Sequence, residues 1–208
     1  EQFMVLDAAT RRNLELTESL RRGSVDGSLL GVLDVTVSSM GGRLLRRWLS
    51  QPLVDLAALN ERLDLVEAFY RDTPLRMRLR TLLKDVSDLE RLTSRVVQGV
   101  ARPRELLAIQ QSLLALAAIR DLLGEGDPGL PFLRSVVALN PCQDVVALVE
   151  QAIADDPPAL LSAGGVIRPG FSAELDNMAS AARNAKEWVA NLEKQERART
   201  GIKNLKVG

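Results

Sequence analysis

The chain has no histidine and a single cysteine, Cys142, among its 208 residues. Without histidine it holds no histidine general base, no Ser-His-Asp triad and no histidine metal site. One thiol excludes an intrachain disulfide and a cysteine zinc cluster, so nothing in the sequence points to secretion. Much of the chemistry of hydrolases and zinc enzymes is therefore excluded by composition alone.

Aromatic residues and long apolar runs are also scarce. Aromatic side chains make up 3% of the chain, which is few for a β-sandwich core. The longest uninterrupted apolar stretch, residues 113–119, is too short to span a bilayer, and no signal peptide opens the chain. We therefore expect a globular protein of the cytoplasm that makes no contact with a membrane.

Charge is balanced overall but uneven along the chain. The 27 basic and 27 acidic residues give no net charge, which argues against a basic surface over the whole molecule. Residues 76–104 carry a net charge of +5, residues 121–176 one of −7 and residues 177–208 one of +4. The first window is typical of solvated helix faces, so the last window, at the end of a long predicted helix, is the more informative.

An apolar repeat of about 3.6 residues dominates, and alternating strand patterns are nearly absent. The sequence therefore predicts an all-α fold, an irregular multi-helix core bundle with one long protruding helix. The repeat and its breakers predict helices over about residues 10–20, 28–35, 41–50, 103–123 and 173–200, with further helix starts at Asp55, Thr73, Ser87 and Asn140.

Two predicted helices carry most of the expected core. Residues 103–123 are apolar on more than one face, which indicates the central core helix. Residues 41–50 are expected to bury Leu44, Leu45, Trp48 and Leu49 on one stripe. Between the helices, the turn-rich residues 164–170 are expected to hold a brief strand or hairpin.

The last predicted helix has an N-cap residue, Ser172, and a glycine at its end, Gly201. It would be about 40 Å long and would leave the core as an arm. Its apolar residues are spaced 3, 4, 3, 4 and 3 apart, the seam of a helix that pairs with one other helix. These seam residues are Leu175, Met178, Ala182, Ala185, Val189 and Leu192. If no partner helix is present, we expect the chain to self-associate through this seam.

Basic residues gather where this helix ends, without an apolar face to cover them. They are Lys194, Arg197, Arg199, Lys203 and Lys206. Such a cluster is able to contact the DNA backbone nonspecifically, and a plain solvated helix end accounts for it comparably well. Residues 202–207 resemble the start of a strand, a short β element at the end of the chain.

A search for chemistry finds no catalytic, cofactor or metal site. There is no phosphate loop and no dinucleotide fingerprint, and Gly41-Gly42 is interpreted as part of a turn between helices. The acidic residues Asp85, Asp88 and Glu90 are interpreted as charges at the N-terminus of a helix that pair locally with Lys84 and Arg91. The chain is thus expected to be noncatalytic.

Motifs spread along the whole chain, in order, resemble the MutS family of DNA mismatch repair ATPases in its bacterial form. The most specific are Gly27-Ser-Leu-Leu-Gly-Val-Leu-Asp34 and Met40-Gly-Gly-Arg-Leu-Leu-Arg-Arg-Trp-Leu-Ser-Gln-Pro-Leu53. Others are Leu6-Asp7-Ala-Ala-Thr10, Asp88-Leu-Glu-Arg-Leu92, Ala101-Arg-Pro-Arg-Glu-Leu106, Gly165-Val-Ile-Arg-Pro-Gly-Phe171, Glu196-Arg-Ala-Arg-Thr-Gly-Ile202 and Leu205-Lys-Val-Gly208.

The resemblance implies a helical core domain over residues 1–171, a lever helix over 172–200 and the start of a clamp domain over 201–208. It implies a mechanical role, in which the core and lever couple an ATPase domain to the DNA clamp in mismatch recognition. The family's Phe-x-Glu mismatch reader and its phosphate loop have no counterpart here, so the chain resembles a core-and-lever segment without them. ATP and Mg²⁺, which the family uses, would be bound by domains absent from the chain.

The resemblance also implies partners for the full-length protein: mismatched duplex DNA, a second subunit in a homodimer, and a MutL-type repair protein. Two alternatives stay open. One is a helical adaptor that binds proteins through a coiled coil and has no role on DNA. The other is a chain that binds the partners of a crossover-type MutS homologue.

Overall fold

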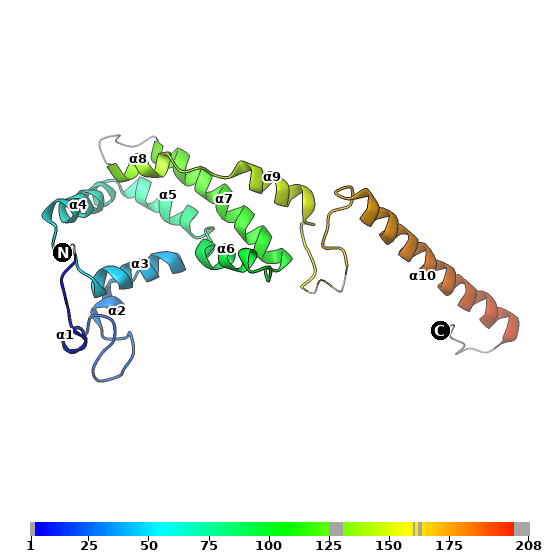
Figure 1. Cartoon of the computed structure of the whole chain (residues 1–208), viewed down its shortest axis with the longest axis horizontal. Helices are drawn as coiled ribbons and strands as arrows, with labels where there is room; N and C mark the ends of the chain where they lie inside the picture. Colours follow the sequence, from blue (N-terminus) through cyan, green and yellow to red (C-terminus); the bar gives the residue numbers. More distant parts are fainter. Residues whose placement is uncertain (1–2, 125–130, 160, 162–163, 202–208) are drawn as a thin grey trace. The chain divides into compact units, whose positions relative to one another are not determined.

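The computed structural model describes residues 3–124, 131–159, 161 and 164–201. Throughout these residues the fold is all-α, as predicted, and its only β-type pairings are the isolated antiparallel bridges Phe3–Leu53 and Ile153–Ile167 (Figure 1). The helices are α1 (Ala8–Asn13), α2 (Leu29–Leu33), α3 (Ser39–Ser50), α4 (Leu56–Arg71), α5 (Thr73–Leu83), α6 (Leu89–Val97), α7 (Pro103–Gly124), α8 (Pro131–Val137), α9 (Gln143–Ala152) and α10 (Ala173–Thr200). The β element predicted at residues 202–207 lies outside the described residues.

Short polar side chains fix where most of these helices begin. At seven helix starts the N-cap side chain accepts a hydrogen bond from the backbone N–H three residues on, which satisfies a donor the helix leaves free. These caps are Asp7, Ser28, Ser38, Asp55, Asp72, Asp88 and Ser172. Because capping depends on neighbouring residues alone, these boundaries could be predicted closely from the sequence.

The first helix is shorter than the predicted 10–20. It ends at Asn13, and Glu15 adopts a positive φ of 47°. The Glu15 carboxylate accepts a hydrogen bond from the Leu20 backbone N–H at 2.5 Å, and the Glu15 carbonyl accepts one from the N–H of Leu29. These hydrogen bonds hold residues 14–28 as a loop against the start of α2, which replaces the expected helical ladder.

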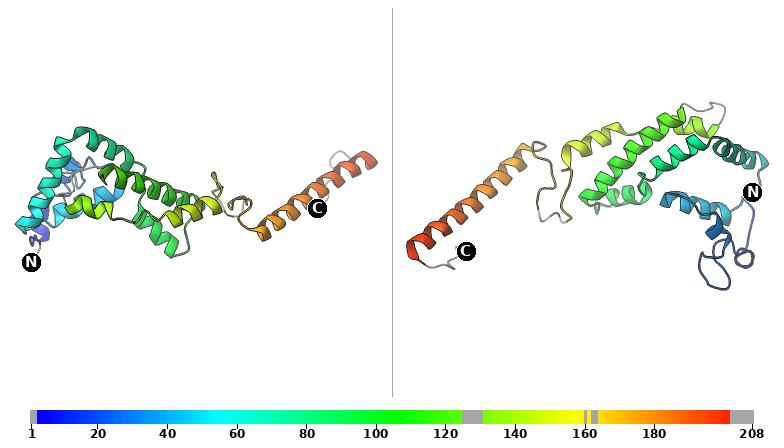
Figure 2. Two further views of the ribbon diagram at one scale, coloured as in Figure 1. Left: turned by 90° about the horizontal axis from the view of Figure 1, so that it is seen from above. Right: turned by 180° about the vertical axis from the view of Figure 1, so that it is seen from behind.

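Helix α7 is the central core helix, as predicted. It lies beside α5, α6 and α8 in every view and contacts each of them (Figures 1 and 2). At one end Ile109 and Leu113 pack with Leu92 of α6 and Val146 of α9. Toward the other end Ile119 and Leu123 pack with side chains of α4 and α5, among them Phe69, Leu75, Leu79, Leu82 and Leu83.

The apolar character of α7 passes a length-and-composition test for a membrane span, alone among the helices of the described chain. Its inner positions are filled by core contacts, including the fully buried Ser112. The Ser112 hydroxyl donates to the Ala108 carbonyl at 2.6 Å and accepts from the Ser87 N–H at 2.9 Å. A core helix that anchors the loop before α6 accounts for this composition.

Helix α3 corrects the prediction for residues 41–50, because none of its residues is fully buried. Leu44 is 46% exposed and Trp48 is 40% exposed, whereas Leu45 and Leu49 are half-buried. The Trp48 ring lies 3.9 Å from the Arg62 guanidinium carbon, a cation–π contact to α4. Leu44 and Trp48 of α3 line an open groove of about 940 Å³ beside α4.

The chain divides into two compact units, Glu1–Glu150 and Gln151–Gly208. In the second unit Ile153 pairs with Ile167, and the Arg168 backbone N–H donates to the Ala152 carbonyl at 2.8 Å. The Arg168 guanidinium also forms an ion pair with Asp155 at 2.7 Å. Only one residue of 164–170, Ile167, takes part in this isolated bridge, so the brief strand or hairpin expected there does not form. The three-part division at residues 171 and 200 stays a prediction.

Candidate nucleic-acid and pairing surfaces

Both ends of α10 are chemically defined. The Ser172 hydroxyl accepts from the Leu175 N–H at 3.3 Å, and the first turn carries Glu174 and Asp176. At the other end the chain turns at Gly201, whose φ is 68° and whose N–H donates to the Arg197 carbonyl at 3.0 Å. Acidic residues at the start and basic residues at the end both complement the helix dipole. The predicted bounds, 173–200, are confirmed.

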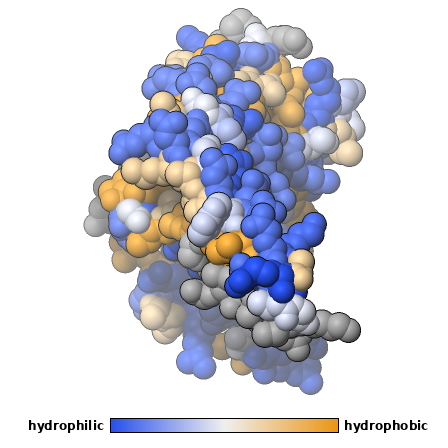
Figure 3. Space-filling model, turned by 90° about the vertical axis from the view of Figure 1, so that its right-hand side faces the viewer, coloured by the Kyte–Doolittle hydropathy of each residue, from blue (hydrophilic) through white to orange (hydrophobic). Residues whose placement is uncertain are grey.

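The seam predicted on α10 lies on a helix that has no fully buried residue. Leu175 is 42% exposed and Met178 is 60% exposed. Ala182 and Ala185 are exposed as well, while Val189 and Leu192 are half-buried. Such apolar residues at the surface are frequent in this chain, and Figure 3 shows several separate apolar patches among hydrophilic residues on one face.

The structure places three of the five predicted DNA contacts on the last two turns of α10. Lys194, Arg197 and Arg199 are exposed there, and the other two, Lys203 and Lys206, lie outside the described residues. Arg197 pairs with Glu193 at 3.2 Å, and Arg199 pairs with Glu196 at 2.8 Å. These glutamates, four and three residues away, lower the positive potential of the helix end.

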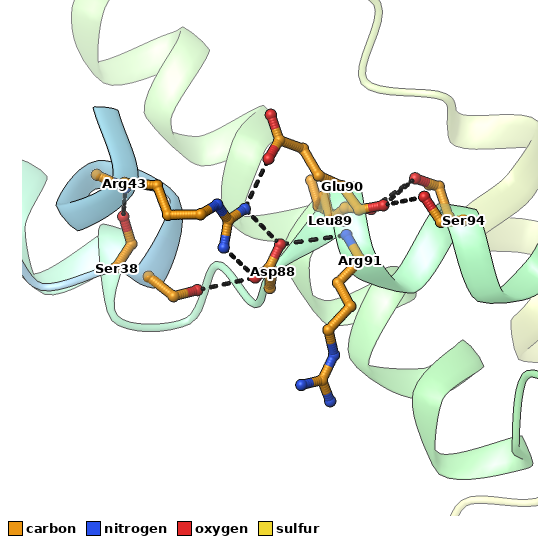
Figure 4. A network of polar contacts seen from close by, with 10 residues as sticks. Ser38, Arg43, Asp88, Leu89, Glu90, Arg91 and Ser94 are labelled. Atoms are coloured by element: carbon orange, nitrogen blue, oxygen red, sulfur yellow. Dashed lines mark hydrogen bonds and ion pairs between the residues drawn. The ribbon is translucent and has the colours of Figure 1, made fainter. Parts of the chain in front are cut away.

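A network of polar contacts joins α3 to the start of α6 (Figure 4). The Arg43 guanidinium donates to both carboxylate oxygens of Asp88, at 2.5 and 2.9 Å, and to Glu90 at 2.6 Å. The Ser39 hydroxyl adds a hydrogen bond to Asp88 at 3.3 Å. We call Ser39, Arg43, Asp88 and Glu90 the α3–α6 clasp.

The clasp corrects the local pairing predicted for Asp88 and Glu90. Arg91 contributes its backbone N–H to Asp88, at 3.2 Å, but the positive charge comes from Arg43, which is 45 residues away. Side chains pair along one helix when they are three or four residues apart. That rule cannot predict a contact between two different helices such as Arg43 with Asp88. The bidentate geometry is the strongest type of arginine–carboxylate contact.

The clasp sets the charge state of its members. Hydrogen bonding from Arg43 holds the pKa of Asp88 well below its usual range, and the Arg91 N–H acts in the same direction. The same contacts raise the pKa of Arg43. Asp88 therefore stays ionised in the folded chain at every pH at which proteins normally fold.

We expect Asp88→Asn to lower the melting temperature by a few degrees at pH 7, because asparagine keeps the helix cap and loses the ion pair. Since the pKa of Asp88 is lowered by folding, its charge stabilises the fold above the ordinary carboxyl pKa of about 4, and this contribution is lost as pH falls. The difference in melting temperature between the wild type and the variant should therefore become smaller as the pH is lowered toward about 3. Thermal melts followed by circular dichroism measure it.

Asp85→Asn is the matched control, since Asp85 is exposed and precedes the cap by three residues. Its melting temperature should follow that of the wild type across the same pH range. If the difference in melting temperature between the wild type and Asp88→Asn stayed constant from pH 7 to 3, the ion pair would not stabilise the fold.

Comparison with known proteins identifies what the chain is similar to. Residues 9–205 match the profile of a family described as MutS domain III. Among curated proteins, the DNA mismatch repair protein MutS of Acetivibrio thermocellus is 47% identical over 208 residues, which is all of this chain and 24% of that protein. The namesakes in Pelotomaculum thermopropionicum and Symbiobacterium thermophilum are 46% and 49% identical, over 100% and 99% of this chain and 24% and 23% of theirs. The chain thus spans about a quarter of the length of these relatives.

Proposed function

The chain belongs to the MutS domain III family, and from this membership we propose that it is the core-and-lever segment that couples an ATPase domain mechanically to a DNA clamp. The relatives are named DNA mismatch repair proteins, so the segment is part of a mismatch repair MutS protein. Helix α10 is the single observation that carries the mechanical role.

Helix α10 suits a lever because it is continuous. Its 28 residues contain no proline or glycine, and it is capped at both ends. At about 1.5 Å per residue it is about 42 Å long. Every interior backbone hydrogen bond is made within the helix, so a displacement at one end is carried to the other without unfolding.

The chemistry of the full-length protein is proposed to lie elsewhere. We assign ATP and Mg²⁺ binding to parts of the MutS protein outside this chain and regard the segment itself as noncatalytic. For the full-length protein we propose mismatched duplex DNA, a second MutS subunit and a MutL-type repair protein as partners, and a location in the bacterial cytoplasm. Family membership supports each of these proposals.

The basic end of α10 is the proposed point of contact with DNA in this segment. Lys194, Arg197 and Arg199 would contact phosphates and carry no sequence information, so matched and mismatched duplexes should bind alike. The glutamates beside Arg197 and Arg199 weaken this attraction. We therefore expect weak binding, with log K falling against log salt with a slope of about −2 to −3 for three phosphate contacts.

Fluorescence anisotropy of a labelled duplex, titrated at several salt concentrations, measures this binding. Replacing Lys194, Arg197 and Arg199 together by glutamine should remove most of this binding, because three of the five predicted cationic contacts are lost. The same change at Arg183 and Lys186, which are exposed earlier on the same helix, is the matched control and should leave most of it. Binding that is undiminished in the triple variant would place DNA contact elsewhere in the chain. Absence of binding at any salt concentration would contradict DNA contact by this segment and would leave only its proposed role as a lever.

A further inference from the structure

Residues 3–53, which include α1, α2 and α3, are tied together by contacts of their own. The backbone bridge Phe3–Leu53 and a hydrogen bond from the Met4 N–H to the Pro52 carbonyl, at 2.8 Å, join the two ends of this stretch. Within it α2 packs on α3, and backbone hydrogen bonds hold the loop before α2 against that helix. We call residues 3–53 the α1–α3 module.

Arginine side chains connect this module to the helices that follow it. In the clasp, Arg43 donates from α3 to the start of α6 (Figure 4). The Arg80 guanidinium donates to the Val35 carbonyl at 3.0 Å, and the Arg62 guanidinium lies over the Trp48 ring. Among the described residues, by contrast, the two apolar core clusters include no member of the module. The module is therefore fixed to the core mainly through charge and less through buried apolar surface.

We propose that the α1–α3 module is a movable part of the fold, which the clasp holds closed and which turns about residues 54–55 when the clasp opens. Residues 54–55 follow the Phe3–Leu53 bridge, have no regular secondary structure and lead directly into α4. Because the chain leaves the module at this point, a change in their backbone angles turns the module as a whole. The proposal does not depend on the role at DNA.

The exposure of the clasp allows it to open. The side chains of Arg43 and Glu90 are 49% and 75% exposed, whereas that of Asp88 is 19% exposed. Ion pairs with such access to water are screened by salt. Because the Arg43 contacts and the Arg80–Val35 hydrogen bond both join the module to the core, they should break together. The open and closed forms are then two distinct states, whose ratio depends on salt and on the charge of Arg43.

Distances between spin labels report the two states directly. In a Cys142→Ser background of the 208-residue chain, Arg46→Cys in α3 and Gln111→Cys in α7 carry the labels, and both positions are exposed. Arg43→Gln should raise the ratio of the longer to the shorter distance about tenfold, because it removes the bidentate ion pair. Salt at about 1 M, where the Debye length is about 3 Å, should shift the unsubstituted clasp in the same direction.

Arg47→Gln is the matched control, because Arg47 is exposed one turn further along α3 and is not a member of the clasp. It should leave the distance distribution unchanged. Glu90→Gln removes one of the two carboxylates and keeps the Asp88 cap, so it should give a smaller shift in the same direction, and it replaces Arg43→Gln if that variant does not fold. A single distance in both clasp variants, at low and high salt alike, would overturn the proposal.

Hydrogen exchange separates movement of the module from weakening of the whole fold. With Arg43→Gln, the amides of α3 should exchange about tenfold faster, because a helix of 12 residues is marginal in water once it loses its contacts with the core. The amides of α7 should accelerate severalfold less. Equal acceleration in α3 and α7 would show that the clasp only stabilises the fold as a whole, and it would contradict a movable module.

Discussion

Leu113→Ala is expected to lower the free energy of unfolding by about 3 kcal/mol, roughly a 150-fold shift toward the unfolded chain. Leu113 is 8% exposed and packs among Leu92, Ile109 and Val146. Truncation removes the transfer free energy of the buried atoms and leaves a cavity where α6, α7 and α9 meet. The substitution should therefore weaken the packing of all three helices.

Leu114→Ala is the matched control, because Leu114 is the next residue of the same helix and is 42% exposed. The two substitutions have the same effect on helix propensity, which slightly favours alanine, so the difference between them reports burial. We expect Leu114→Ala to lower the free energy of unfolding by less than about 1 kcal/mol. Urea unfolding followed by circular dichroism gives both values. Equal losses at the two positions would show that α7 does not form the core as described.

The sequence predicted most of what depends on neighbouring residues. Caps such as Ser28, Asp55 and Ser172 fix helix starts locally, and the length and composition of α7 mark a core helix wherever its neighbours lie. The same reasoning predicted the full extent of α10. The seam and the basic end also follow from spacing along this one helix, and their roles in pairing and in DNA contact stay predictions.

The features that sequence reasoning missed depend on contacts between distant residues. Trp48 shares an apolar stripe with leucines, and only the position of α4 shows that its ring stays partly exposed under Arg62. Arg43 finds Asp88 and Glu90 through folding, across a separation that no helical spacing rule covers. The early end of α1 has the same origin, since loop hydrogen bonds to Glu15 compete with the helical ladder.

Gly31→Ala is the second large effect, and it opposes the ordinary preference of helices. Alanine in place of a helical glycine normally stabilises by about 1 kcal/mol. At Gly31 in α2, however, a Cβ atom would lie well inside contact distance of the Val25 carbonyl oxygen. That carbonyl accepts hydrogen bonds from the Ser28 hydroxyl at 2.6 Å and the Ser28 N–H at 3.0 Å, so it cannot move aside without losing them.

We therefore expect Gly31→Ala to destabilise the chain by about 1–3 kcal/mol, the usual cost of overpacking. Gly124→Ala, at the end of α7, is the matched control, because its added Cβ would meet only a Val137 methyl at an ordinary 3.8 Å. Thermal melts should show the Gly31 variant melting below the wild type and the Gly124 variant melting at or above it. A higher melting temperature for Gly31→Ala would contradict this prediction. It would mean that the loop over residues 19–28 moves away from α2 at little cost, and that the fully buried Ser28 does not hold the loop and the helix together.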